Sequence, residues 1–301
     1  MVVAVVGIIG TLQPVVGAES RLKYFGYYGA DGFWVKPPGF LLEIAKLGNS
    51  NVAVVSGHHG REDMQTVLRL CSEHGIKAWV TAYDCFFKYD PKRSGPVAMH
   101  SDWQKYWQSL KDNIKGREDA VMGFYFDEPY WNGVKEDDFR LATKLIRKDY
   151  PAKRILACLT VIELDPKKWN SPIPEVSKAY YGFVTDGAFD YYGKWDEASY
   201  ATMLDHLKSK MVRRQAIWLV PWAFMVPGRN TQPEVLAEHL TKCYELALKE
   251  PRCVGLLPFC YSTSEAGWGI GCNRLFDPKD PLYAPKLKQL HIEIGKRISR
   301  P

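Results

Sequence analysis

Stretches with the pattern of β-strands alternate with helical stretches along most of this 301-residue chain. Buried strands are indicated by eight apolar runs, at 23–28, 51–56, 77–83, 120–126, 154–161, 189–193, 215–222 and 253–259. Helices are indicated at 40–47, 61–74, 102–114, 137–150, 174–181, 197–211, 233–250 and 285–298. Strands joined by helices pair in parallel, and eight such units close a (β/α)8 barrel. We therefore predict an α/β fold, a single-domain (β/α)8 TIM barrel over residues 19–301, with a doubly wound open sheet as the alternative.

The composition is that of an ordinary soluble protein with a sizeable core. Apolar residues make up 46% and charged residues 25% of the chain. The net charge of +6 comes from positive residues interleaved with acids, without a clustered basic patch, so we expect no nucleic-acid partner. No GxGxxG motif follows a predicted strand, so a dinucleotide cofactor has no support, and we expect no cofactor at all.

The N-terminus resembles a secretory signal. Residues 1–18 carry no charge, 2–9 are apolar, and Val16-Gly17-Ala18 has the small residues of a signal-peptidase site. The usual basic segment at the start is missing, and an N-terminal strand is the alternative. We predict a signal peptide at 1–18 and a secreted or exported protein, with no other apolar run long enough to span a bilayer.

Seven cysteines are spread along the chain without the spacing of a zinc site. Cys260 and Cys272 bracket one loop, and we predict a disulfide between them if the protein is exported. Cys71 and Cys158 lie in apolar patterns and are expected to be buried. Neither HxH nor HExxH occurs, so we predict no metal site.

Two adjacent carboxylates end the fourth predicted strand. The apolar run 120–126 is followed by Asp127-Glu128-Pro129, and the proline closes the strand. Carboxylates next to a buried strand are costly unless a partner, a polar pocket or a reaction explains them. Ligands bind at this end of parallel strands in α/β folds, so we expect the functional site here.

Other polar and aromatic side chains also follow predicted strands and would gather at the same rim. Aromatic rings stack on sugar rings and acids bond sugar hydroxyls, so this set favours a carbohydrate site, in which a carboxyl pair does the chemistry. The residues are Tyr27, Tyr28, His58, His59, Tyr83, Asp84, Asp190, Tyr192, Trp222, Tyr261, Glu265 and Trp268.

With these residues the chain resembles the clan A (β/α)8 glycoside hydrolases. Many of those enzymes carry Asn-Glu-Pro at the end of strand four, and the resemblance implies that Glu128 of Asp127-Glu128-Pro129 is the general acid/base. It also implies that the ring of Trp268 forms the floor of the subsite that binds the cleaved sugar. Clan A enzymes place a nucleophilic Glu after strand seven, whereas 220–224 of this chain contain no acid. The second carboxylate must then come from another strand end, and the candidates in order of preference are Asp190, Asp84, Glu265 and Asp127.

We predict a monomeric glycoside hydrolase that cleaves a poly- or oligosaccharide by carboxylate acid/base catalysis. The alternatives are a lectin-like barrel that binds sugar without cleaving it and a metal-dependent hydrolase that uses His58, His59 and Asp127. Glu128, Asp127 and Asp190 are the expected catalytic residues. The expected substrate-binding residues are Tyr27, His58, Asp84, Tyr192, Trp222, Glu265 and Trp268.

Overall fold

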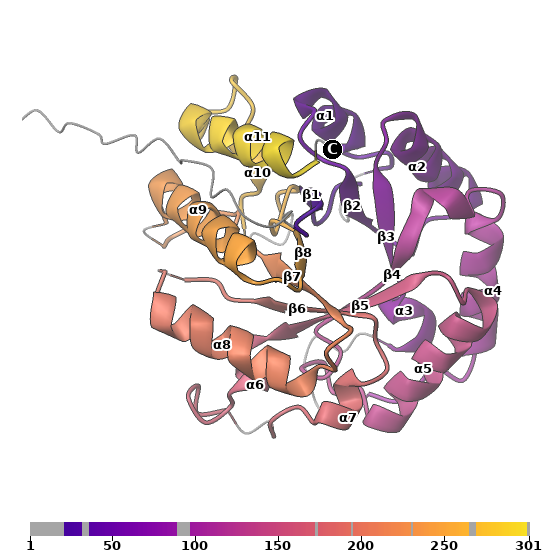
Figure 1. The fold of residues 1–301 in the computed structure, drawn as a ribbon. Helices are drawn as coiled ribbons and strands as arrows, with labels where there is room; N and C mark the ends of the chain where they lie inside the picture. The colour runs from indigo at the N-terminus through magenta and orange to yellow at the C-terminus, as the bar shows by residue number, and fades with distance from the viewer. Residues whose placement is uncertain are drawn as a thin grey trace, which may run out of the picture.

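The computed structural model describes residues 21–31, 36–88, 97–171, 174–193, 195–229, 231–264 and 269–299. In this part of the chain eight parallel strands close into one barrel in sequence order, and the last strand pairs with the first (Figure 1). The predicted (β/α)8 barrel is confirmed, and the open-sheet alternative is wrong. The predicted signal peptide lies outside the described residues, so secretion stays a prediction.

The strands begin and end within a few residues of the predicted positions. They are β1 Tyr24–Tyr27, β2 Val52–Val55, β3 Lys77–Thr81, β4 Val121–Asp127, β5 Arg154–Thr160, β6 Asp186–Asp190, β7 Ala216–Val220 and β8 Cys253–Leu256. Only β6 is displaced as a whole, since 189–193 was predicted. Its first two residues, Asp186 and Gly187, broke the apolar pattern used for that prediction.

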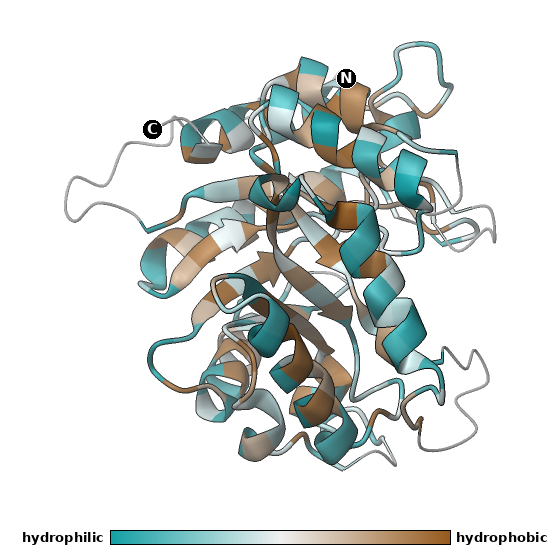
Figure 2. Ribbon diagram, turned by 90° about the vertical axis from the view of Figure 1, so that its right-hand side faces the viewer, coloured by the Kyte–Doolittle hydropathy of each residue, from teal (hydrophilic) through white to brown (hydrophobic). Residues whose placement is uncertain are grey.

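Long helices surround the barrel and cover the outer faces of its strands (Figure 1). In Figure 2 the strands are mostly hydrophobic, whereas the helices carry both hydrophobic and hydrophilic residues. None of the described helices is long and apolar enough to cross a membrane. The long helices are α1 Leu41–Leu47, α2 Arg61–Glu73, α4 Trp103–Ile114, α5 Glu136–Asp149, α8 Glu197–Lys210, α9 Pro233–Lys249 and α11 Pro285–Ser299. The short ones are α3 Tyr83–Phe86, α6 Val161–Leu164, α7 Lys178–Tyr181, α10 Cys272–Leu275 and the 3-10 turn η1 Glu118–Ala120.

The N-terminal half of the barrel interior is filled by an ion pair among aromatic rings. Arg154 forms a bidentate ion pair with the fully buried Asp186, and the Nε1 of Trp218 donates to Asp186 Oδ1 at 2.8 Å. Trp79 meets Trp218 edge to face. Gly255 leaves the room that the Trp218 ring needs, because a Cβ there would lie 2.2 Å from it. These side chains therefore fill this end of the barrel interior, whereas ligands bind at the opposite end in enzymes of this fold.

All seven cysteines are free thiols with buried side chains, so the predicted Cys260–Cys272 disulfide is wrong. Cys260 Sγ donates to the carbonyl of Ser262 at 3.1 Å, and Cys272 Sγ donates to that of Ala223 at 3.4 Å. The two thiols thus bond to different stretches of backbone. The expected burial of Cys71 and Cys158 is confirmed.

Candidate functional site

Asp127, the last residue of β4, accepts two tyrosine hydroxyl groups at the C-terminal end of the barrel. Tyr28, which follows β1, donates to Oδ2 at 3.0 Å, and Tyr125 donates to Oδ1 at 2.8 Å. Tyr125 and Asp127 share a face because side chains alternate along a strand. Burial raises the pKa of Asp127, and the Asp84 charge adds to this, whereas the two tyrosine bonds lower it. Burial and Asp127 also raise the pKa of both tyrosines, so the hydroxyls remain donors.

Glu128 is held by a left-handed backbone turn directly after β4. Its φ is 43°, a conformation that non-glycine residues rarely adopt and that tends to occur at functional sites. Its N–H extends the ladder to the carbonyl of Cys158 at 3.0 Å, and its own carbonyl accepts from Asn132 N–H at 2.9 Å. The side chain forms a hydrogen bond with the carboxyl group of Asp190. The two acids, the first choices from the sequence, are therefore neighbours.

Asp190 closes β6 and is 7% exposed. Burial and then the charge of Asp127 raise its pKa to about 7, whereas hydrogen bonds from Tyr192 and with Glu128 lower it. The carboxyl group therefore changes charge in the neutral range. Tyr192, one of the predicted substrate-binding residues, lies beside it, with its pKa held well above the usual range mainly by burial.

A fourth carboxyl group, Glu163, lies close enough to Asp190 to be affected by its charge and was not predicted. It is fully buried and belongs to a capping box at the start of α6, where its carboxyl group accepts from the N–H of Thr160. It also accepts from the N–H of Trp131 at 2.5 Å, which ties α6 to the loop that follows Glu128. Burial, with a contribution from the charge of Asp190, raises its pKa to about 8. The sequence contained its signal, since Thr160-Val161-Ile162-Glu163 fits the S/T-x-x-E capping box.

Phe259, beyond the end of β8, is a partly exposed ring beside this cluster and was also missed. Its centroid lies 4.8 Å from that of Tyr28 and 5.6 Å from that of Tyr192, to which it is nearly parallel. An aromatic residue at the end of the eighth predicted strand was the available signal. Trp268 and Glu265, which were predicted in this region, lie outside the described residues, and their roles stay predictions.

The structure contradicts the prediction that Tyr27 binds substrate. The side chain is fully buried, and its hydroxyl accepts from Asn49 Nδ2 at 3.0 Å and lies 3.2 Å from His291 Nδ1 on α11. It therefore faces the helix layer, and the next residue, Tyr28, faces Asp127 instead. Trp222 is 8% exposed and packs against Phe224 and His239, so little of its ring is accessible to a substrate.

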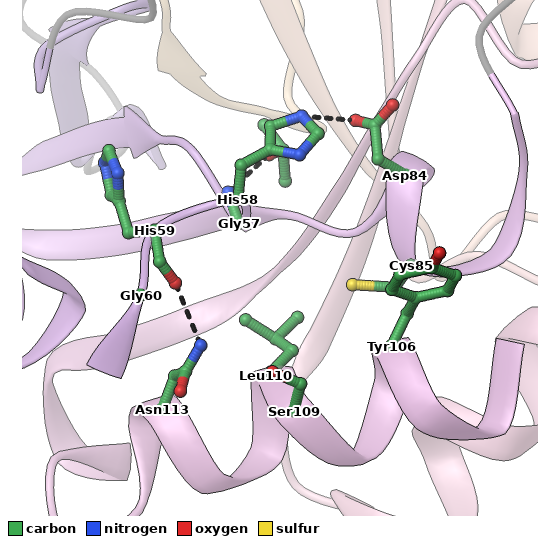
Figure 3. A pocket seen from close by; sticks show the side chains of 11 residues that line it. Gly57, His58, His59, Gly60, Asp84, Cys85, Tyr106, Ser109, Leu110 and Asn113 are labelled. Atoms are coloured by element: carbon green, nitrogen blue, oxygen red, sulfur yellow. Dashed lines mark hydrogen bonds and ion pairs between the residues drawn. The ribbon is translucent and has the colours of Figure 1, made fainter. Parts of the chain in front are cut away.

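Two His–Asp pairs join the loop after β2 to the segments that follow β3 and β1. His58 Nε2 is 2.8 Å from Asp84 Oδ2 (Figure 3), and His59 Nε2 is 2.5 Å from the buried Asp31 Oδ2. The bond with Asp84 raises the pKa of His58. The two histidines thus have different partners, and the described residues contain no cluster of three or more histidine, cysteine and acidic side chains that could hold a metal ion. This geometry gives no support to the metal-dependent alternative with His58, His59 and Asp127.

No family model and no curated protein sequence matches the chain. Solved structures match its fold. A Bacteroides thetaiotaomicron VPI-5482 protein assigned as an α-L-fucosidase has a TM-score of 0.59 at 14% identity, over 96% of this chain and 98% of that one. A fungal endo-β-N-acetylglucosaminidase of glycosyl hydrolase family 18 has a TM-score of 0.55 at 13% identity, over 91% and 98%.

A psychrophilic glycoside hydrolase family 10 endo-β-1,4-xylanase has a TM-score of 0.55 at 11% identity, over 90% of this chain and 97% of that one. The chain also matches longer β-glucuronidases, of which it spans less than half. At such low identity these matches establish a shared fold, a (β/α)8 barrel of the kind found in glycoside hydrolases.

Proposed function

We propose that this protein is a glycoside hydrolase whose reaction is carried by Glu128 and Asp190. The observation that supports this most strongly is the hydrogen bond between their carboxyl groups at the end of the barrel where ligands bind. Glycoside hydrolysis needs one carboxyl group that donates a proton and one that is ionised, and environments that separate two pKa values supply such a pair.

In this reaction Glu128 is the general acid, which donates a proton to the leaving glycosidic oxygen. Asp190 is ionised, accepts from Tyr192, and acts either as the nucleophile or as the base for a water molecule. Catalytic carboxyl groups are ~5 Å apart in retaining enzymes and ~6.5–9.5 Å apart in inverting enzymes, whereas Glu128 and Asp190 are joined by a hydrogen bond. The Glu128 side chain must therefore rotate away from Asp190 when a sugar ring enters between them.

Asp127 and the aromatic rings would support this reaction. Asp127 is fixed by Tyr28 and Tyr125 and raises the pKa of Asp190 by its charge. The partly exposed ring of Phe259 offers an apolar face to a sugar. The structures of similar fold are named for fucose, xylan and N-acetylglucosamine substrates, which agrees with a carbohydrate substrate without selecting one.

The test is hydrolysis of a panel of aryl glycosides and polysaccharides, read as released aryl alcohol or reducing sugar. Glu128→Gln and Asp190→Asn should each lower kcat/KM by about 10²–10⁴. Asp205→Asn is the matched control, because this acid is 74% exposed on α8 and should leave the rate unchanged. Turnover by the Glu128→Gln variant at the wild-type rate would contradict the proposal.

A barrel that binds sugar without cleaving it is the second candidate. The end of β7 favours it, because Val220, Pro221 and Trp222 supply no acid where clan A enzymes have their nucleophile. Saturable binding of a glycan from the same panel without product, unchanged in Glu128→Gln, would support this candidate over the hydrolase.

A further inference from the structure

A cavity of about 280 Å³ opens between the loop after β2 and helix α4 (Figure 3). Its upper side carries the His58–Asp84 pair, and its lower side is formed by one face of α4 with Tyr106, Ser109 and Leu110. None of Asp127, Glu128 and Asp190 lines it, so it is separate from the proposed reaction centre. We call it the side cavity.

Hydrogen bonds join the groups that line the side cavity, and several of these groups are accessible. His58 and Asp84 fix each other at 2.8 Å, with side chains 59% and 34% exposed. Asn113 donates to the backbone carbonyl of His59 at 2.9 Å, which ties the β2 loop to α4. Tyr106 is 44% exposed, a large fraction for an aromatic ring in a protein whose other rings are mostly buried. A preformed concave site with a few polar groups beside an apolar surface is the usual form of a small-molecule site.

The chemistry of the lining suits a neutral polyol with one apolar face. Asp84 accepts hydrogen bonds, His58 and Ser109 can donate and accept them, and Tyr106 and Leu110 supply apolar surface. When His58 is protonated, its charge and that of Asp84 cancel, so the pair does not favour an anion. The size of the cavity, near the lower end of small-molecule pockets, is right for one sugar ring rather than a long chain.

Asp84 connects the side cavity to the reaction centre. It lies in the first turn of α3, directly after β3, and its charge is close enough to contribute to the electrostatics of Asp127. Asp84 therefore borders the side cavity and also lies close to Asp127.

We propose that the side cavity is a subsite that binds one neutral sugar ring of an oligosaccharide next to the bond that is cleaved. This inference depends on the carbohydrate substrate of the proposed function but not on its hydrolysis. It implies that the protein acts on oligosaccharides in preference to single-sugar glycosides, because the second ring contributes binding free energy through His58, Asp84 and Tyr106.

The test uses the full chain with Glu128→Gln, which prevents turnover. The Cε1–H resonance of His58, assigned with His58→Gln, is followed while cello-, xylo-, manno- and chito-oligosaccharides are added. Ser109→Trp fills the side cavity from the exposed face of α4, and Gln108→Trp is the matched control because Gln108 is exposed and outside the cavity. We expect one series to shift the His58 resonance, and Ser109→Trp to weaken binding at least about tenfold, or about 1.4 kcal/mol, with Gln108→Trp close to wild type.

Kinetics give the second measurement. In the background that retains Glu128, Ser109→Trp should raise KM for the oligosaccharide about tenfold and leave kcat/KM for an aryl monoglycoside within about twofold. Absence of any shift at His58, or equal binding by Ser109→Trp and Gln108→Trp, would overturn the subsite. Binding at His58 without hydrolysis by the wild type would instead refute the proposed reaction and leave the subsite in place.

Discussion

Glu128, which directly follows β4, and Asp190, which ends β6, form a hydrogen bond although these two strands are not neighbours in the barrel. Two carboxyl groups joined in this way hold one proton between them and titrate as a pair. Tyr192 donates to the same Asp190 carboxyl group, and the charge of Asp127 acts on it. The two carboxyl groups thus have different surroundings, as acid/base catalysis requires, and Asp190 is the one that accepts a hydrogen bond from Tyr192.

The first prediction concerns the acid limb of the pH profile. If Asp190 must be ionised, kcat/KM rises with pH through its pKa of about 7. Asp127→Asn removes the charge that raises this pKa, so the limb should move to lower pH. Tyr192→Phe removes a hydrogen bond that lowers the pKa, so the limb should move to higher pH.

The measurement is kcat/KM across about pH 5 to 9 for the wild type and both variants. The informative result is that the apparent pKa of the acid limb shifts in opposite directions in the two variants. A general disruption of the site would lower kcat/KM without shifting these pKa values in opposite directions. Shifts in the same direction would contradict the assignment of Asp190. The groups that act on Asp190 and can complicate the profile are Asp127, Glu128, Tyr192, Cys158 and Glu163.

The second prediction is that Glu163 positions the loop that carries Glu128. Its two carboxyl oxygens accept from Thr160 N–H and Trp131 N–H, and a glutamine has only one acceptor oxygen for these two donors. Glu163→Gln should cost about 1–3 kcal/mol of unfolding free energy. It should also lower kcat more than it changes KM, and Glu163→Asp should not restore the rate because it is too short to reach Trp131. Wild-type kinetics in Glu163→Gln would contradict this role.

The pKa of Glu163 gives this variant a pH signature. Burial raises the pKa from 4.5 to about 8, so the folded state holds the proton more tightly than the unfolded state does. The resulting stabilisation is fully present below about pH 4.5 and is lost as the pH rises through about 8. Urea unfolding should therefore show the largest difference between wild type and Glu163→Gln at acidic pH, and a smaller one at alkaline pH.

The third prediction concerns the thiols. All seven are free and buried, and burial raises the pKa of Cys71, Cys85 and Cys253 to about 12, so the native protein should react slowly with a thiol reagent. After unfolding in urea without reductant, seven thiols should react. If only five thiols react, two of the seven cysteines are joined in a disulfide, and Cys260 and Cys272 are the pair to examine first.

The barrel could be predicted because its signal is repeated in every unit, whereas the direction of single side chains could not. Tyr27 and Tyr28 are adjacent tyrosines at a strand end, and only the pairing of β1 with β2 and β8 decides which one faces Asp127. The loop between Cys260 and Cys272 likewise suggested a disulfide from its length alone, without the directions of the two Cβ atoms.

The carboxyl pair Glu128 and Asp190 could be predicted from the sequence, but the side chains around the pair could not. The ends of strands four and six mark Glu128 and Asp190, because strand ends meet at one rim. Glu163 instead follows β5 within a local capping box, and its proximity to Asp190 depends on how β5 pairs with β6. Asp186 looked like a break in the sixth strand because its partner Arg154 lies 32 residues away in sequence.

The last prediction tests the filled end of the barrel interior. An alanine Cβ at Gly255 would lie 2.2 Å from the Trp218 ring, and that ring is fixed by Asp186, Tyr24 and Trp79. Because the ring cannot move without breaking these contacts, Gly255→Ala should lower the unfolding free energy by about 1–3 kcal/mol, measured by urea denaturation. Gly60→Ala is the control, since its φ is −61° and no atom lies within 4 Å of the added Cβ. Combining Gly255→Ala with Trp218→Phe should recover part of the lost unfolding free energy, because the smaller ring frees the space that the methyl group needs. If the single and double variants lose the same unfolding free energy, the Trp218 ring is not what Gly255 accommodates.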